Sequence, residues 1–364
     1  MRSIIGAYVE ITGACNEKCP YCYNEKLVNS ENALPLMKLS AVIRELRENG
    51  ISNVAFSGGE PFLFDGFERV LQEASDLGMG LRIISNGVCF EEENLPLLRR
   101  FQPGLQVTFD GWDASSHDCT RGIGNFAKIT TGIKNARQNG FIGDVAVRVN
   151  LQKGNIAHVA KILDMLQELF DVDNEAIRDV GSIDIALLRK TDSDSGNFAG
   201  YLEIEEYKQY PEIFELFADW NHRHTAQITH EFSNADISCP YNADFDDVKC
   251  GIRIALDGNV FPCQAFIDNV FSIGNIHNET LKEIMNGTKL AEFVDAVHGR
   301  QGSISQCQAC GYVSMCAGGC PAQAFIENRT LNSVSARCDS RKAHFNIALQ
   351  SIMKHALQKT APSK

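Results

Sequence analysis

Residues 15–24, CNEKCPYCYN, decide the fold, and in them Cys15, Cys19 and Cys22 are spaced C-x3-C-x2-C. An apolar, β-branched run at residues 4–11 leads directly into this stretch. Three thiolates on one short loop can hold three irons of a 4Fe–4S cluster and leave the fourth iron open to a ligand. A zinc site is the alternative, but zinc would need a fourth Cys or His close by. The motif and the strand before it together favour the cluster.

Outward from this loop, the first half of the chain alternates strand-like and helix-like segments. Such alternation predicts parallel strands joined by crossover helices. About six units fit before residue 190, too few for the eight of a closed barrel. We therefore expect an α/β fold with an open, partial (β/α)6 TIM-like barrel. The expected strands are residues 4–11, 54–56, 81–85, 105–109, 145–149 and 183–188, and the clearest helices are residues 39–49, 67–77, 126–139 and 156–170.

Each polar or glycine-rich motif of this half falls just after an expected strand. Active sites of α/β barrels are built on the C-terminal ends of the strands. We therefore expect these motifs to ring one mouth of the barrel. They are Ser57-Gly58-Gly59-Glu60-Pro61, Ser85-Asn86-Gly87, Thr108-Phe109-Asp110-Gly111 and Val149-Asn150.

The second half has a different texture. Residues 191–200 indicate a loop and residues 204–224 an amphipathic helix. From Cys239 onward the chain offers short strands, Gly and Cys, with a hairpin signal at Asp257-Gly258 between residues 252–256 and 260–263. Residues 339–358 could form a closing helix. We expect two domains, residues 1–225 and 235–345, with the closing helix reaching to about residue 358.

A second set of cysteines lies in this half. The chain has 13 cysteines in tight local groups, which indicates metal or cluster binding in a reducing compartment more than a disulfide framework. Taken alone, the C-x2-C-x5-C-x3-C part of the set fits a zinc ribbon and an iron–sulfur cluster equally well. The set is Cys250, Cys263, Cys307, Cys310, Cys316, Cys320 and Cys338, with Gly258 between the first two.

Composition excludes several classes of protein. The 364 residues are 44% hydrophobic and 22% charged, which is ordinary for a soluble globular protein. The net charge of −12 argues against a nucleic-acid partner. No apolar run approaches the roughly 20 residues of a membrane span, and the N-terminus lacks the pattern of a signal peptide. We expect a cytoplasmic protein with no membrane partner.

At this point the sequence resembles the radical SAM superfamily, on its cysteine triplet, on Tyr21 before the last cysteine, and on Gly58-Gly59-Glu60-Pro61. The resemblance covers roughly the first half of the chain. It implies that the open iron binds the amino and carboxylate groups of S-adenosylmethionine (SAM). One electron from the reduced cluster cleaves a carbon–sulfur bond of SAM, and the 5′-deoxyadenosyl radical abstracts hydrogen from an unactivated C–H bond. The protein aligns that bond and excludes water.

The resemblance also implies contacts to SAM. Gly58, Gly59 and Glu60 match the motif that meets the SAM amino group, and Tyr21 matches the position whose backbone contacts the adenine. Other polar residues lie where related enzymes hold the ribose and carboxylate, although turn formation and loop capping would also account for them. They are Ser85, Asn86, Thr108, Asp110 and Arg121, together with Arg148 and Asn150, which end the fifth expected strand and could also face SAM.

The full C-terminal set resembles the SPASM extension of radical SAM enzymes, which binds two auxiliary 4Fe–4S clusters and would bring the total to three. By this resemblance Cys250, Cys263 and Cys320 serve the first auxiliary cluster, and Cys307, Cys310, Cys316 and Cys338 serve the second. Cys239 is the candidate for the missing fourth ligand of the first; the alternative is an open iron that binds substrate. Cys89 and Cys119 are left over, and we expect buried structural thiols there.

Two auxiliary clusters suggest that electrons are moved as well as a radical generated. Members of the subfamily mostly modify peptides and proteins. Our leading hypothesis is a maturase that oxidatively modifies a ribosomally made peptide, for instance by a C–C or thioether crosslink. An anaerobic sulfatase-maturating enzyme, which forms formylglycine, comes second and a small-molecule radical dehydrogenase third. That second reaction would require a general base near the substrate, and none can be assigned from the sequence. A non-catalytic electron carrier or zinc-ribbon module is disfavoured, because neither needs a SAM pocket.

Partners follow from the same resemblance. We expect a peptide or protein substrate and a reductant such as flavodoxin or ferredoxin. Because the cysteine triplet begins at residue 15, we expect no fused leader-binding domain ahead of it. Either a separate protein binds the leader of the substrate, or the barrel binds the substrate directly.

Overall fold

The computed structural model describes residues 3–24, 32–173, 180–188, 198–207, 209–230, 239, 241, 249–343, 345, 346, 349 and 350. One sheet of ten strands runs through them, in the order β10-β9-β8-β1-β2-β3-β4-β5-β6-β7. Neighbours from β8 through β1 to β7 are parallel, whereas β9 is antiparallel to both β8 and β10. The strands are β1 (Ser3–Thr12), β2 (Asn53–Gly58), β3 (Gly80–Ile84), β4 (Gly104–Thr108), β5 (Val145–Leu151), β6 (Ser182–Leu187), β7 (Gln227–His230), β8 (Lys249–Ile254), β9 (Asn259–Phe261) and β10 (Gly274–Asn275).

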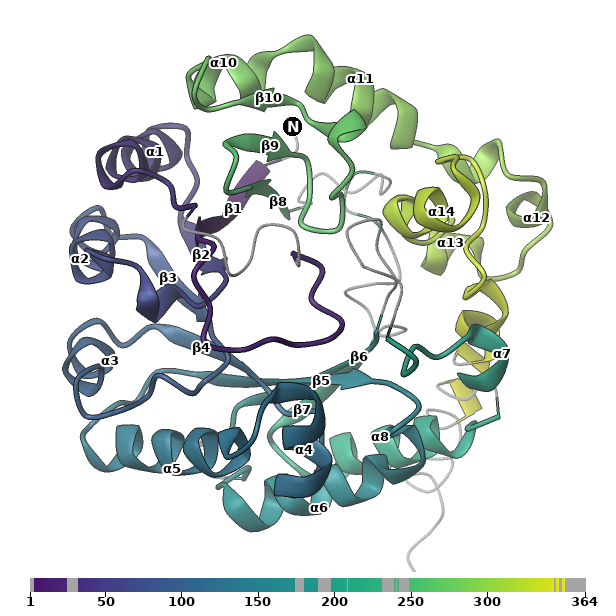
Figure 1. Cartoon of the computed structure of the whole chain (residues 1–364). Helices are drawn as coiled ribbons and strands as arrows, with labels where there is room; N and C mark the ends of the chain where they lie inside the picture. The colour runs from purple at the N-terminus through teal and green to yellow at the C-terminus, as the bar shows by residue number, and fades with distance from the viewer. Residues whose placement is uncertain are drawn as a thin grey trace, which may run out of the picture.

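Helices follow the parallel strands and lie outside the curved sheet (Figure 1). Such a helix packs its apolar face against the sheet. In helix α2, for example, the buried residues Phe67, Val70 and Leu71 recur at helical spacing and pack onto the core. In the first part the helices are α1 (Leu36–Glu48), η1 (Pro61–Leu63), α2 (Phe67–Asp76), α3 (Leu95–Phe101), α4 (Ala114–Arg121), α5 (Asn125–Gln138), η2 (Ile156–His158), α6 (Val159–Leu169), α7 (Ile204–Tyr207) and α8 (Glu212–Arg223).

The C-terminal part carries the second cysteine set, and its helices are short. These helices are η3 (Asn269–Phe271), α10 (Leu281–Asn286), α11 (Thr288–Val297), η4 (Arg300–Gly302), α12 (Ser305–Gln308), α13 (Val313–Cys316) and α14 (Pro321–Asn328). Residues 338–343, 345, 346, 349 and 350 are also helical, and the rest of the expected closing helix lies outside the described residues, as do residues 191–197 of the expected loop. None of the described helices is long and apolar enough to cross a membrane.

The side chains of strand β1 alternate between the two faces of the sheet. Its Val9 and Ile11 are buried in the apolar core beneath the helices, whereas Tyr8 and Glu10 point to the opposite face and bind polar partners. Because side chains alternate along a strand, one face supplies the core and the other is left for polar groups.

The fold class expected from the sequence is confirmed. Six strand–helix units precede residue 225, and β8 and β9 form the hairpin, with Gly258 at φ 82° in its turn. The sheet is open, since β10 and β7 occupy its two edges. The domain bounds remain predictions.

Three elements differ from expectation. The helix expected at residues 204–224 is divided into α7 and α8, with Pro211 between them in place of a continuous turn. Strand β7 adds a seventh parallel strand after α8. Strand β8 pairs in parallel with β1, so the cysteine-rich part continues the first sheet.

Candidate functional site

The three-cysteine loop leaves the carboxyl end of β1. Cys15, Cys19 and Cys22 are partly buried thiols, and the backbone N–H of Cys22 donates to the carbonyl of Cys19 at 3.2 Å. Burial raises the pKa of Cys15 to about 11. Because thiolates bind iron, metal loading at this loop must displace protons.

The glycine motif after β2 packs directly on this loop. The N–H of Gly59 donates to the carbonyl of Thr12 at 2.7 Å, and the N–H of Glu60 donates to that of Ala14 at 2.8 Å. A Cβ on Gly59 would lie 2.1 Å from the Ala14 oxygen, and Gly58 adopts φ 128°. The two glycines thus leave room for the backbone of the cysteine loop.

Glu60 is fully buried at the centre of the glycine motif. Its carboxylate accepts from the Ser85 hydroxyl at 2.9 Å, the Asn86 N–H at 2.8 Å and the Phe62 N–H at 3.3 Å. Burial raises the pKa of Glu60 to about 7, and these hydrogen bonds oppose the shift. Glu60 thus ties the ends of β2 and β3 together.

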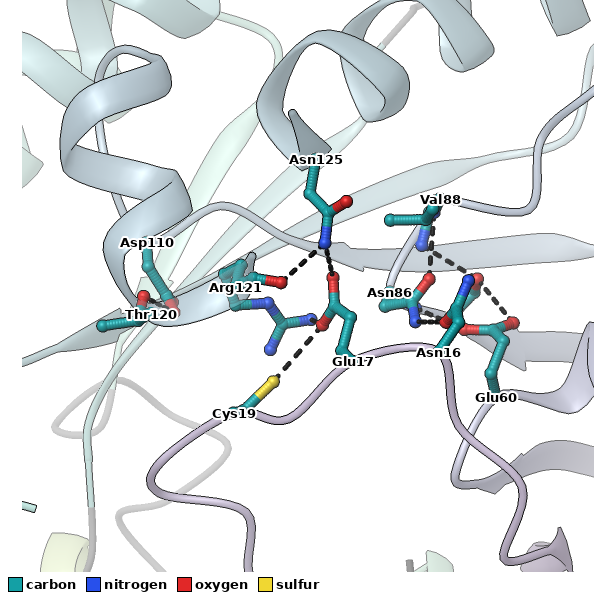
Figure 2. A network of polar contacts seen from close by, with 12 residues as sticks. Asn16, Glu17, Cys19, Glu60, Asn86, Val88, Asp110, Thr120, Arg121 and Asn125 are labelled. Carbon is teal, nitrogen blue, oxygen red and sulfur yellow. Dashed lines mark hydrogen bonds and ion pairs between the residues drawn. The ribbon is translucent and has the colours of Figure 1, made fainter. Parts of the chain in front are cut away.

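Asn86 extends this contact to the cysteine loop (Figure 2). Its side-chain amide donates to the Asn16 carbonyl oxygen at 2.6 Å, while its own oxygen accepts from the Val88 N–H at 2.9 Å. The second bond is the local turn expected of an Asn-Gly pair, and the first joins β3 to the residue after Cys15.

A buried ion pair lies on the other side of the loop (Figure 2). Arg121 of α4 contacts Glu17 at 2.9 Å, and their side chains are 9% and 1% exposed. Glu17 also accepts from the Cys19 thiol at 3.3 Å and from the Asn125 amide at 2.9 Å. Burial raises the pKa of Glu17, opposed first by the charge of Arg121.

Asp110 organises the end of β4. Its carboxylate accepts from the hydroxyls of Tyr21 and Thr120 and, at 3.4 Å, from the Asn150 amide. The Asp110 N–H donates to Nδ1 of His117 at 3.2 Å. Burial lowers the pKa of His117 to about 4, so this ring is neutral at pH 7 and can accept.

Two further expected contacts lie on β4 and β5. Arg148 of β5 is paired with Asp184 of β6 and donates to the Asn150 oxygen at 3.2 Å. Thr108 ends β4 opposite Arg148 in the sheet register. The loops after β1, β2, β3 and β4 are thus joined at one edge, as expected for the mouth of the barrel. The assignment of these residues to SAM remains a prediction.

Sequence reasoning missed part of this network. Asn16 and Glu17 occupy the gaps of the cysteine motif, but nothing in the sequence links them to Asn86 or Arg121. Their place between Cys15 and Cys19 was the available signal.

A second buried pair was also missed. Glu10 of β1 is fully buried and binds Arg253 of β8 at 2.9 Å. Tyr23, the residue after Cys22, donates to the same Glu10 oxygen at 3.4 Å, and its hydroxyl lies 2.7 Å from that of Tyr8. The cysteine loop is thereby connected to the hairpin that begins the C-terminal part.

In the C-terminal part, Cys307, Cys310, Cys316 and Cys338 line one cavity. These are the four residues that the resemblance assigns to the second auxiliary cluster. Among the described residues, no three Cys, His, Asp or Glu side chains are placed to hold a single metal ion. Four thiols around a cavity fit a bulky cluster, whose cysteines attach to separate irons.

The remaining cysteines are less completely placed. Cys239, Cys263 and Cys320 are partly buried against the core, and Cys250 pairs with Ile4 through its backbone, although its side chain is not described. Of the leftover cysteines, Cys89 is buried, as expected, and its sulfur accepts from Asn16 at 3.4 Å. The expectation for Cys119 was wrong, because it lies exposed on α4, where its thiol needs no apolar partner.

Comparison with known families decides the relationship. The model of the radical SAM superfamily matches residues 9–166, and the SPASM model, an iron–sulfur cluster-binding domain, matches residues 247–321. The chain belongs to the radical SAM superfamily. Its radical SAM domain contains the cysteine triplet and the joined loops, its SPASM domain contains the hairpin, and membership makes the protein an enzyme.

Relatives of this radical SAM–SPASM chain include a biosynthesis protein and a maturating enzyme. It is 24% identical over 331 residues to the antilisterial bacteriocin subtilosin biosynthesis protein AlbA of Bacillus subtilis, covering 89% of this chain and 68% of AlbA. It is 23% identical over 367 residues to the cysteine-type anaerobic sulfatase-maturating enzyme of Clostridium perfringens. That match covers 93% of this chain and 94% of the Clostridium enzyme. The structure of native anSMEcpe with bound AdoMet and Cp18Cys peptide shares the fold, with a TM-score of 0.76 and 18% identity. The match covers 98% of this chain and 100% of the anSMEcpe chain.

Proposed function

We propose that this enzyme binds SAM and three 4Fe–4S clusters and oxidatively modifies a side chain of a ribosomally made peptide, forming a C–C or thioether crosslink. The observation that carries the proposal is the joining of the loops after β2, β3 and β4 to the three-cysteine loop after β1, in one chain with a separate four-cysteine cavity. AlbA, a bacteriocin biosynthesis protein, supports the peptide substrate.

The residues present fit these groups. Cys15, Cys19 and Cys22 would hold the first cluster and leave one iron for SAM, since no fourth cysteine ligand is needed there. When bound, the reduced cluster and SAM supply a radical that abstracts hydrogen from carbon. The cavity cysteines would hold one auxiliary cluster, and Cys239, Cys250, Cys263 and Cys320 the other.

The polar residues of the mouth would bind and orient SAM. Glu60 would face the SAM amino group, and Asn86, Asp110 and Asn150 would face its ribose and carboxylate, with Ser85, Thr108 and Arg121 behind them. The buried Arg121–Glu17 pair would fix the cysteine loop, because separating two charges so far removed from water would be costly. Tyr21 anchors the loop to Asp110.

A sulfatase maturase is the second candidate. It is favoured by the nearly full-length match to the Clostridium perfringens enzyme. That reaction would need a base near the substrate. A reductant such as ferredoxin or flavodoxin, and a separate leader-binding protein, complete the partners that we propose.

The test begins with anaerobic reconstitution and the analysis of iron, sulfide and zinc. We expect about twelve irons per chain, falling by about four when Cys15, Cys19 and Cys22 are changed to Ala. Reduced enzyme and SAM are then incubated with candidate precursor peptides or a sulfatase peptide, and deoxyadenosine and peptide mass are followed. Loss of two hydrogens from a precursor peptide supports crosslinking, and formylglycine supports the alternative. Zinc in place of auxiliary iron would refute the cluster assignment.

A further inference from the structure

Arg300 of η4 is a buried cation between the cysteine-bearing loops. Its side chain is only 1% exposed. It donates to four backbone carbonyls, those of Leu331 at 2.7 Å, Gly318 at 2.7 Å, Gly319 at 3.1 Å and Ser333 at 2.6 Å. Two of these carbonyls lie between Cys316 and Cys320 in the chain, and the other two precede Cys338.

The charge of Arg300 has no carboxylate partner in the described part of the chain. A second arginine, Arg341, is 3% exposed. Its Nη2 donates to the Ser335 hydroxyl at 3.2 Å, and its Nε is buried without a hydrogen-bond partner. The two guanidinium groups lie beside adjacent glycines, Arg300 at Gly318 and Arg341 at Gly319, so that like charges are close together. Two buried cations without a counter-charge are strongly unfavourable, so a negative group is needed close by.

The groups that face these arginines are thiols. Arg300 binds the carbonyls of Gly318 and Gly319, which lie between Cys316 of one proposed auxiliary set and Cys320 of the other. Negative charge on Cys239, Cys320 and Cys307 would favour the charged form of Arg300. Arg341 lines the cavity of Cys307 and its three companions. Thiols become negative when they bind iron, so cluster loading would supply the missing charge.

The backbone is shaped to keep both arginines in place. Ala317, Gly318 and Gly319 all have positive φ, at 45°, 80° and 71°. A Cβ on Gly319 would lie 2.3 Å from Nη1 of Arg341. The turn therefore presents carbonyls to Arg300 and leaves room for Arg341.

We propose that Arg300 is the counter-charge shared by the two auxiliary clusters and that it stabilises their reduced state. The inference rests on the proposed function, because it requires both clusters. A 4Fe–4S cluster with thiolate ligands is anionic, and more so when reduced. A fixed cation in a poorly solvated site therefore raises its reduction potential.

The test uses the full chain with Cys15, Cys19 and Cys22 changed to Ala, so that only auxiliary clusters give signals. Iron and sulfide are counted first, and a redox titration followed by electron paramagnetic resonance gives the potentials. For Arg300→Gln we expect the ratio of reduced to oxidised cluster at a fixed potential to fall about tenfold, which is about 59 mV for a one-electron couple. Arg300→Lys keeps the charge and should keep the potential.

The outcomes separate charge from structure. A Gln variant that fails to load iron while the Lys variant loads normally also supports the counter-charge. A Gln variant with unchanged potentials, a Lys variant that shifts as far as Gln, or loss of iron in both variants would overturn it, because Arg300 would then be a hydrogen-bond anchor only. Zinc or no iron in the parent chain would instead refute the proposed clusters.

Discussion

Arg121 and Glu17 hold the cysteine loop through charges that are almost wholly removed from water. Changing Arg121→Gln would leave a buried carboxylate without its partner. We expect the free energy of unfolding of the cluster-free chain to fall by about 3–5 kcal/mol, measured by urea denaturation.

Two controls distinguish coupling from general damage. The double variant Glu17→Gln/Arg121→Gln should recover much of the loss, because it removes both charges; simple addition of two losses would contradict the coupling. Arg100→Gln breaks the Arg100–Glu68 pair, whose side chains are 55% and 59% exposed, and should cost less than about 1 kcal/mol.

Glu60 gives a pH dependence whose sign follows from its environment. Burial raises its pKa to about 7, so the fold favours the protonated acid. Its contribution to stability is complete below the unfolded pKa of about 4.3 and is lost as pH rises through about 7. We expect unfolding measurements on cluster-free protein at pH 5 and pH 8 to show a decline of about 3 kcal/mol from this group. Glu60→Gln should remove this part of the decline in the free energy of unfolding between pH 5 and pH 8. The same decline in the variant as in the parent chain would contradict the role of Glu60.

At the scale of elements, the loop after β2 is built to accept the cysteine loop. Gly59→Ala would place a methyl group 2.1 Å from the Ala14 carbonyl oxygen, which is backbone and cannot simply move aside. We expect reconstituted protein to lose about four irons while the auxiliary clusters remain. Iron and sulfide analysis measures this loss.

Gly154→Ala is the matched control, because nothing lies within 4 Å of its added Cβ. Its iron content should equal that of the parent chain. Full iron in Gly59→Ala would show that the two loops can separate without harm to the cluster.

The elements found from sequence are those with strong periodic patterns. The strand ending at Ile11 and the helix containing Phe67 were predicted because their buried residues recur regularly. Helix α4 was missed because its exposed residues are polar, and only the cap formed by Asp113 and Ser116 marks its start.

Contacts within the site were less predictable than its position. The expected mouth follows from motifs at strand ends, which local pattern reveals. The pairing of Glu10 with Arg253 joins residues 243 positions apart, and each looks like an ordinary strand residue in the sequence. Which opposite charges meet is decided by sheet register, and no local pattern encodes it.

At the scale of the whole molecule, β8 binds the first and last parts into one sheet. A chain ending at residue 230 would expose one edge of β1 and leave Glu10 buried without Arg253. We expect it to lack cooperative unfolding, measured by circular dichroism during urea denaturation.

Arg253→Met in the full chain isolates the electrostatic part of this effect. It keeps β8 paired with β1 and should lower the free energy of unfolding by about 3–5 kcal/mol. A truncated chain that unfolds cooperatively with the stability of the full chain would show that β8 is dispensable.

The place of β1 has a consequence for biosynthesis. It precedes the other strands of the sheet along the chain, yet it lies in the interior of the sheet, between β2 and β8. Its second edge must stay unpaired until residues 249–254 have emerged. Until then Glu10 also lacks its ion-pair partner, Arg253. A nascent chain therefore carries an open sheet edge until β8 has emerged, and during that time chaperone capture competes with self-association.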